Sequence, residues 1–239
     1  MLQKFIRLVK QQGLRRALKG AIHILAVESY AISERRFDFK FHVDTSTIVR
    51  LEQYDIDEEK KKTAVRYQPT PIKPLRSILQ ALDIDHSRYT FVDIGSGKGR
   101  VLLLASEYPY KKIIGVEISN RLHRIAQKNF ETWTNSQQKC QDLECICVDA
   151  REYQFPEDPL VLFFFTPFTG DVLGRVIDNL NKSLSENPRP VEVIYFGSNE
   201  ELIDLFRTLD FPSKQICDPI PFLNYRGILF SDASREAYA

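Results

Sequence analysis

A glycine-rich segment, Gly95-Ser96-Gly97-Lys98-Gly99, follows an apolar run that ends in Asp93. Glycines between a strand and a helix let the backbone approach a ligand closely and let the helix begin against the sheet. The segment therefore predicts a nucleotide-binding loop, and three kinds of loop are possible.

Two of these loops do not fit the spacing. A P-loop has glycine five positions before its Gly-Lys pair and a hydroxyl residue after it, whereas this chain has Val92 and Gly99 there. A dinucleotide-binding loop has glycine at its first, third and sixth positions, and the sixth position counted from Gly95 is Arg100. A P-loop is thus excluded and an oxidoreductase is disfavoured.

The third loop fits. An acid followed by alternating glycines resembles the first motif of class I methyltransferases, which use S-adenosylmethionine. The resemblance implies that Asp93 lies near the cofactor's amino group or holds the loop through backbone N–H groups. It also implies that the loop backbone packs against the methionine part, at Gly95, Ser96, Gly97 and Gly99.

Two further acids follow the next two predicted strands. Carboxylates at successive strand ends meet in the crevice where open α/β sheets bind ligands. Glu117, with Ile118 beside it, is placed to accept hydrogen bonds from both ribose hydroxyls. The resemblance implies that Asp149 and the backbone N–H of Ala150 contact adenine, although Asp149 also fits as an N-cap for a segment beginning at Arg151.

The fourth strand ends in Thr166-Pro167-Phe168. Amine methyltransferases that act on nucleobases have Asn or Asp-Pro-Pro-aromatic at this point, so the Thr weakens a nucleobase assignment and leaves the acceptor atom open. Phe168 would stack on a planar or apolar acceptor.

Upstream, the segment Tyr67-Gln68-Pro69-Thr70 precedes a predicted helix. Together with the loop and the Thr-Pro-Phe strand, it resembles an uncharacterised bacterial group of class I methyltransferases and has some similarity to protein-lysine methyltransferases without a SET domain. That similarity implies that Tyr67, Gln68 and Thr70 line the site, and Thr70 also fits as a helix N-cap.

Methyl transfer from a sulfonium needs positioning and exclusion of water more than proton transfer. We therefore expect Thr166, Phe168 and Tyr67 to position an unidentified acceptor, a protein side chain or a small molecule, and we assign no general base. The alternative is a catalytically silent S-adenosylmethionine-binding accessory or regulatory module. No metal site is predicted.

The elements that must hold these residues alternate between strand and helix. We expect a Rossmann-like, mostly parallel seven-stranded sheet with helices on both faces, an antiparallel edge strand and an N-terminal helical arm. The expected strands are 90–94, 112–117, 143–148, 160–165, 191–196, 214–218 and 226–230. The expected helices are 99–107, 120–134, 170–184 and 199–209, the last with a capping box of Ser198 and Glu201, after a helix that begins at Thr70-Pro71.

Residues 1–66 are predicted to be a basic arm and linker, and residues 67–239 the methyltransferase domain. Residues 2–27 have apolar positions at helical spacing, and residues 37–66 lack a clear period. The first 40 residues hold nine Lys or Arg and three Asp or Glu, so the arm either packs on the domain or contacts a membrane surface or a partner.

The bulk composition sets further limits. A net charge of +1 gives no clear nucleic-acid signature, and no apolar run reaches the length of a membrane span. The four cysteines lack zinc-site or redox-motif spacing, which favours reduced thiols. We expect a cytoplasmic protein, with peripheral membrane contact through the arm left open, and an undetermined oligomeric state.

Overall fold

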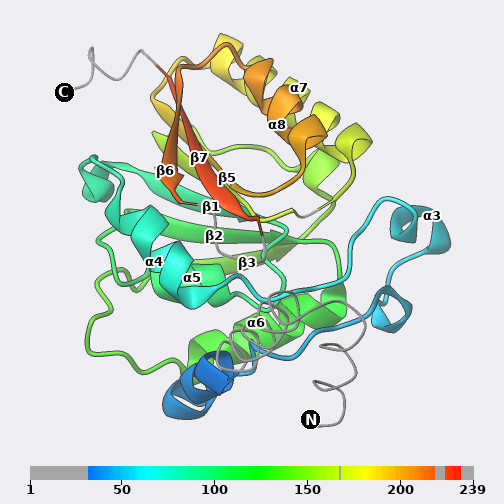
Figure 1. Cartoon of the computed structure of the whole chain (residues 1–239), viewed down its shortest axis with the longest axis vertical. Coiled ribbons are helices and arrows are strands. Elements are labelled where there is room, and N and C mark those ends of the chain that lie inside the picture. The colour runs from blue at the N-terminus through cyan, green and yellow to red at the C-terminus, as the bar shows by residue number, and fades with distance from the viewer. Residues whose placement is uncertain (1–31, 167, 219–223, 233–239) are drawn as a thin grey trace, which may run out of the picture.

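The computed structural model describes residues 32–166, 168–218 and 224–232. They form a seven-stranded sheet in the order β3-β2-β1-β4-β5-β7-β6 (Figure 1). The strands are β1 (Thr90–Ile94), β2 (Lys112–Glu117), β3 (Leu143–Cys147), β4 (Leu160–Phe164), β5 (Val191–Gly197), β6 (Ser213–Cys217) and β7 (Arg226–Ser231).

The sheet is mixed. Strands β1 to β5 pair in parallel, whereas β7 is antiparallel to both β5 and β6. The strand order reverses between β1 and β4, and open α/β sheets bind ligands beside the carboxyl ends of the strands at such a point. The predicted fold is confirmed, with the antiparallel pairs at the β6 edge.

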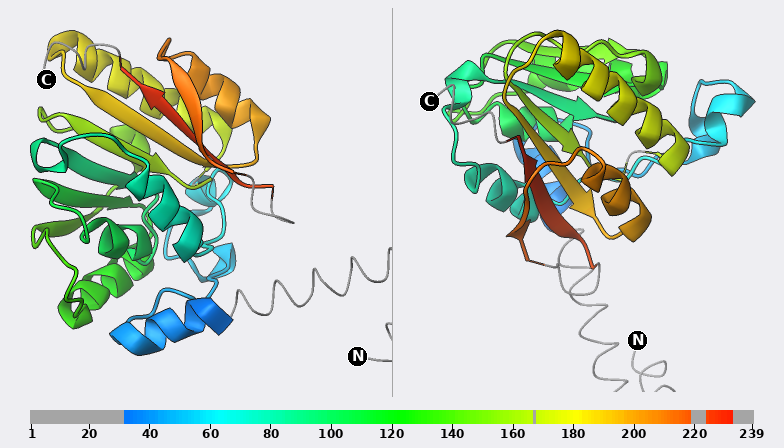
Figure 2. Two further views of the ribbon diagram at one scale, coloured as in Figure 1. Left: turned by 60° about the vertical axis from the view of Figure 1, so that its left-hand side comes forward. Right: turned by 90° about the horizontal axis from the view of Figure 1, so that it is seen from above.

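Helices cover both faces of the sheet (Figure 2). On one face of the sheet, an apolar cluster joins α4 and α5 to side chains of β1 and β4. On the opposite face, a second cluster joins α7 and α8 to the sheet. The α-helices are α3 (Glu58–Lys61), α4 (Ile72–Gln80), α5 (Arg100–Ala105), α6 (Asn120–Thr132), α7 (Gly170–Glu186) and α8 (Glu200–Arg207), with single 3₁₀ turns η1 (Leu51–Gln53), η2 (His86–Arg88) and η3 (Ala150–Glu152).

The central strands are apolar throughout because both faces are covered. Every residue of β1, β4 and β5 is buried, including Asp93 in β1 and Glu192 in β5. Such strands are rigid supports, so the residues that follow them are held in fixed positions relative to one another.

Two predicted helix caps are wrong. At α8 the cap is Asn199, whose side chain accepts from the Glu201 N–H, and not Ser198. At α4 the Thr70 side chain makes no cap, and the carboxylate of Glu34 accepts from the Ile72 N–H instead. The carboxylate of a distant helix has replaced the local hydroxyl there.

The prediction that residues 37–66 form an irregular linker is also wrong in part, because the stretch includes the end of a helix as well as η1 and α3. Residues 32–41 are helical, and Phe37 and Phe41 pack on Trp133 at the end of α6 with ring centroids 5.8 and 4.6 Å away. These rings belong to the same core cluster as α4 and α5. The domain boundary at residue 66 stays a prediction.

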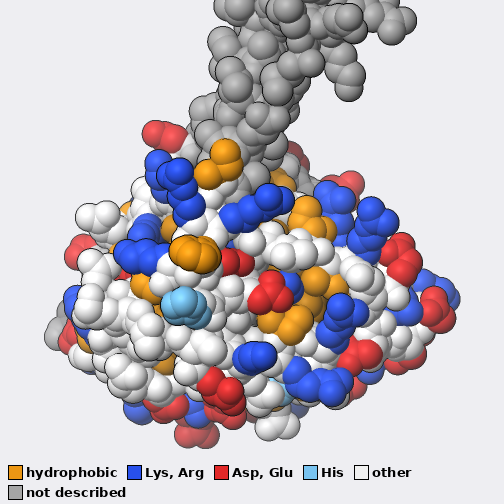
Figure 3. All heavy atoms as spheres, turned by 90° about the horizontal axis from the view of Figure 1, so that it is seen from below, with side chains coloured by type: hydrophobic (Ala, Val, Ile, Leu, Met, Phe, Trp, Pro, Cys, Tyr) orange, Lys and Arg blue, Asp and Glu red, His pale blue; other side chains and the backbone are white. Residues whose placement is uncertain are grey.

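The predicted basic helix over residues 2–27 lies outside the described residues. Within the described ranges, no helix is long and apolar enough to cross a membrane. The face seen from below carries Lys and Arg interspersed with Asp and Glu, and hydrophobic side chains lie between them in small groups (Figure 3). The cytoplasmic location and the arm's partners stay predictions.

Candidate functional site

The glycine loop connects β1 to α5 at the switch point of the sheet. Gly95, Gly97 and Gly99 have φ angles of 87°, 57° and 81°, which only glycine adopts without strain. The N–H groups of Gly95 and Ser96 donate to the Val116 carbonyl of β2 at 2.8 and 3.0 Å. The loop backbone is thereby pinned to the sheet, at the floor of a pocket.

Most predicted cofactor residues line this pocket, and Gly99 does not. The lining includes Asp93, Gly95, Ser96, Gly97, Glu117, Ile118, Asp149, Ala150 and Thr70, together with Tyr67, Thr166 and Phe168 from the predicted acceptor side. A Cβ atom at Gly99 would meet Phe130 and Ala126 of α6 at 3.1 and 3.2 Å. Gly99 therefore permits close packing of α6 on the start of α5.

Asp93 is a buried carboxylate whose charge no described residue neutralises. Its residue is 3% exposed, and its carboxylate has no hydrogen bond or ion pair with any described residue. Burial and the charge of Glu117 raise the pKa of Asp93 well above its usual value. A buried carboxylate without a donor is costly, which indicates that a cationic or donor-rich ligand group completes it. The alternative role, holding the loop through backbone N–H groups, is not observed.

Glu117 is held from two sides at the end of β2. Its Oε2 accepts from the Gly97 N–H and its Oε1 from the Ser119 N–H, both at 2.8 Å. Burial raises its pKa to about 7 despite these hydrogen bonds. The side chain thus supports the glycine loop, and each oxygen retains a lone pair for a further donor.

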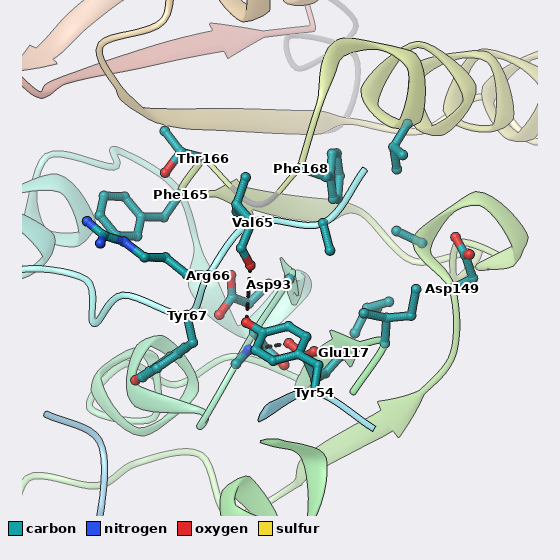
Figure 4. Close-up of a pocket in the computed structure, with 18 of the residues that line it drawn as sticks. Tyr54, Val65, Arg66, Tyr67, Asp93, Glu117, Asp149, Phe165, Thr166 and Phe168 are labelled. Carbon is teal, nitrogen blue, oxygen red and sulfur yellow. Dashed lines mark hydrogen bonds between the residues drawn. The ribbon is translucent and has the colours of Figure 1, made fainter. Parts of the chain in front are cut away.

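Asp149 follows β3 and caps η3, as the alternative interpretation predicted. Its Oδ1 accepts from the Arg151 N–H at 3.0 Å, and its Oδ2 pairs with Arg151 Nη2 at 2.6 Å. Burial acts to raise the pKa of Asp149, but the bonds and charge of Arg151 outweigh it and lower the pKa. The carboxylate is ionised and fixed at the pocket's far end (Figure 4).

Tyr67 covers the glycine loop from above. A Cβ atom at Gly97 would lie 2.3 Å from two Tyr67 ring carbons, and the Tyr67 hydroxyl donates to the Thr45 carbonyl at 2.7 Å. The neighbouring Lys98 pairs with Asp44 at 2.7 Å. Residues 44–45 thus fix the ring against the loop.

The segment of residues 63–68 crosses the mouth of the pocket and is held at both ends. At one end Tyr67 pairs with Val49, and at the other Ala64 pairs with Phe168 and the Thr63 carbonyl accepts from the Thr169 N–H at 3.1 Å. The Tyr54 hydroxyl donates to the Val65 carbonyl between these ends (Figure 4). This segment therefore joins the Tyr67 side of the pocket to the Thr166 side.

Thr166 has a strained backbone. Its φ angle is 40°, a left-handed conformation that is rare for a β-branched residue. Such strain is typical of functional sites. The neighbouring Phe165 stacks on Phe196 at 5.4 Å and meets Tyr225 edge-on at 5.5 Å, which makes an aromatic wall beside Thr166.

Several lining residues had no predicted role. Tyr54, Val65, Arg66 and Phe165 line the pocket, and the first three come from the stretch that was expected to be a linker. That stretch has no period that marks an element, although Arg66 adjoins the recognised Tyr67 segment. The described residues contain no His, Cys, Asp and Glu group that could hold a metal ion.

The reversed strand order, the glycine loop and the three strand-end acids define a Rossmann-like methyltransferase of class I. A family model for the histone methylation protein DOT1 matches residues 19–142, and the chain belongs to this family. The predicted family resemblance is thereby confirmed.

Comparisons with individual proteins agree. A protein-lysine N-methyltransferase of Saccharolobus islandicus is 35% identical over 68 residues, which are 28% of this chain and 42% of that protein. The precorrin-6y C5,15-methyltransferase of Geobacter metallireducens superposes with a TM-score of 0.53 at 13% identity, over 76% of this chain and 94% of that one. A precorrin 8w decarboxylase of Methanobacterium thermoautotrophicum superposes with a TM-score of 0.50 at 14% identity, over 70% and 93%. At these identities the structures establish the fold alone.

Proposed function

We propose that the chain binds S-adenosylmethionine in this pocket and transfers its methyl group to an acceptor. The observation that carries the proposal is Asp93, a buried carboxylate with no partner among the described residues. S-adenosylmethionine brings a sulfonium and an ammonium group, and such cations offset the charges of Asp93 and Glu117.

The same charges disfavour a dinucleotide. A pyrophosphate beside Asp93 and Glu117 would add negative charge to a site that already holds two carboxylates. Lys98, the cation within the loop, is buried and paired with Asp44. Arg100, which follows the loop, is 2% exposed and paired with Glu34 and Asp38. Its guanidinium is therefore committed to the N-terminal helix and not to a phosphate.

The other strand-end residues are proposed to bind the nucleoside part of the cofactor. Glu117 would accept from ribose hydroxyls, and Asp149 and the Ala150 N–H would bind adenine at the far end. When bound, the cofactor would supply an electrophilic methyl group. The chain's own residues would hold the acceptor beside Thr166 and exclude water beneath residues 63–68.

The family description and the Saccharolobus relative support an active methyltransferase over a silent binding module. The relative's name makes a protein lysine one acceptor to test. The matched stretch spans 42% of that protein, so its acceptor does not carry over to this chain.

Calorimetry tests the cofactor. We expect S-adenosylmethionine and S-adenosylhomocysteine to bind and NAD not to bind. Asp93→Asn should weaken S-adenosylmethionine binding by about 1–3 kcal/mol, because it removes a charged acceptor. Asp178→Asn, an exposed position on α7, is the matched control and should leave the affinity unchanged. Binding of NAD alone would contradict the proposal.

Turnover with radiolabelled S-adenosylmethionine on fractionated lysate then tests catalysis. Label in any fraction that depends on the wild-type protein supports transfer, and its location in protein or in small molecules identifies the acceptor class. Cofactor binding without any transferred label would instead support a silent module.

A further inference from the structure

The charged side chains of the pocket are divided between its two halves. Asp93, Glu117 and Asp149 line the half assigned to the cofactor. Three cations also line the pocket there: Arg151 is paired with Asp149, the charge of Lys60 acts on Asp149, and Arg100 is paired with Glu34. The acceptor half is lined by Val65, Arg66, Gln68, Phe165, Thr166 and Phe168. Of these described residues, Arg66 alone carries a charge.

Arg66 is held by its backbone and free at its tip. The preceding Val65 carbonyl accepts from Tyr54, and the following Tyr67 pairs with Val49 on both backbone groups. Its guanidinium makes no hydrogen bond or ion pair with a described residue. Figure 4 shows the side chain running from residues 63–68 toward the ring of Phe165.

The acceptor half of the pocket also has an aromatic wall. The Phe165 ring is packed between Phe196 and Tyr225, and the Tyr225 hydroxyl accepts from Gln68 Nε2 at 3.3 Å. These contacts hold the wall in place, and its exposed edge offers an apolar surface in the same half of the pocket as the five donors of the Arg66 guanidinium. Such a pairing fits a molecule with a flat apolar part and an oxyanion.

We propose that the methyl acceptor carries a carboxylate or phosphate that Arg66 binds, with an aromatic or other flat group against Phe165. This proposal rests on the proposed methyl transfer and adds the acceptor's charge to it. A bare ammonium acceptor gains no opposite charge from the described lining of this half and meets the like charge of Arg66. Arg66 is thus the residue that determines acceptor specificity.

Three probes of similar size test the charge preference: benzoate, phenyl phosphate and benzylamine. Each is titrated by ligand-observed NMR into full-length protein saturated with S-adenosylhomocysteine, so that the cofactor half is filled. We expect the two oxyanions to bind more tightly than the amine. Their affinities should fall as salt is raised, because Arg66 is exposed.

Variants assign the effect to Arg66. Arg66→Met should weaken both oxyanions by about 10-fold or more, as expected for a lost charge-assisted hydrogen bond, and leave benzylamine unchanged or tighter. Arg66→Lys should give an intermediate loss of oxyanion affinity, because a lysine keeps the positive charge but cannot donate two parallel hydrogen bonds as a guanidinium does. Arg36→Met removes an exposed arginine of the helix at residues 32–41 and should change nothing.

The stronger of benzoate and phenyl phosphate identifies the oxyanion. Equal oxyanion affinities for wild type and Arg66→Met, tighter binding of benzylamine, or no oxyanion binding to the loaded wild type would each overturn the inference. Since S-adenosylhomocysteine binding is measured in the same samples, failure of the cofactor site is distinguished from failure of the acceptor proposal.

Discussion

The ring of Tyr67 occupies the space that a side chain at Gly97 would need. A Cβ atom at Gly97 would lie 2.3 Å from ring carbons of Tyr67, whose hydroxyl is tied to the Thr45 carbonyl. The glycine is therefore required by the chain's own covering segment as well as by the turn at its φ of 57°.

Gly97→Ala should accordingly lower the free energy of unfolding by about 2–4 kcal/mol, from backbone strain and displacement of the ring. It should also abolish measurable binding of S-adenosylhomocysteine. Urea denaturation and calorimetry measure the two effects. The control is Gly174→Ala in α7, where a Cβ meets nothing within 4 Å and should add about 0.5–1 kcal/mol. Normal binding by Gly97→Ala would refute the close approach.

Substitution of Arg100 should also destabilise the protein strongly. Its guanidinium is 2% exposed, pairs with Glu34 and Asp38, and donates to Thr45 Oγ1 at 2.7 Å. Arg100→Met leaves the buried Glu34 and the partly buried Asp38 without their cation and should destabilise the protein by about 3–5 kcal/mol. Thermal and urea unfolding measure this loss.

The comparison is an exposed pair on α8. Arg207 bonds Asp204 at 2.5 Å with both side chains at least 60% exposed, so Arg207→Met should cost at most about 0.5 kcal/mol. Equal effects of the two substitutions would show that the pairs of Arg100 with Glu34 and Asp38 contribute no more to stability than an exposed pair does.

The strain at Thr166 gives a prediction of opposite sign. Asparagine tolerates the left-handed region far better than a β-branched residue, so Thr166→Asn should raise the free energy of unfolding by about 1 kcal/mol. The reverse substitution can be made at Asp210, which is exposed and has a φ of 57°. Asp210→Thr should lower the free energy of unfolding by a similar amount. A loss of stability in Thr166→Asn would mean that the threonine side chain contributes more than its backbone strain costs.

The raised pKa of Glu117 predicts how the free energy of unfolding depends on pH. Burial raises its pKa in the folded protein from 4.5 to about 7, so between these values the folded state holds more protons than the unfolded state. Its contribution to the free energy of unfolding therefore falls as pH rises through this window, by up to about 3 kcal/mol.

Urea unfolding at pH 5 and pH 7.5 should show this loss for wild type and a smaller one for Glu117→Gln. The comparison is needed because His86 and His123, whose pKa values burial lowers, titrate in both proteins with the opposite sign. Identical pH dependence in the two proteins would place the titration elsewhere.

The strands and their terminal acids could be predicted because their signals are local. The apolar runs that became β1 and β2 have the predicted bounds, and Asp93, Glu117 and Asp149 line one pocket as expected. The identity of a strand depends on its own residues, and the parallel pairing then brings the strand ends together.

The covering segments could not be predicted because their partners are distant in sequence. Glu34 caps α4 at Ile72, 38 residues later, and the same carboxylate pairs with Arg100. Likewise Ala64 meets Phe168 across the pocket. No period within residues 37–66 records such contacts, so a charged, irregular stretch was assigned to a linker although part of it encloses the site.

The attachment of residues 63–68 at both ends also bears on how fast the pocket can open. For residues 63–68 to lift away from the pocket, backbone pairs must break at one end, either those of Tyr67 with Val49 or that of Thr169 with Thr63. Such an opening would be a local unfolding event, and the amides of the end that opens, either Val49 and Tyr67 or Thr169, would then exchange their hydrogens with solvent. If S-adenosylmethionine binds as proposed, the rate of this opening would limit the release of the product, and hydrogen exchange would report that rate where every opening leads to exchange.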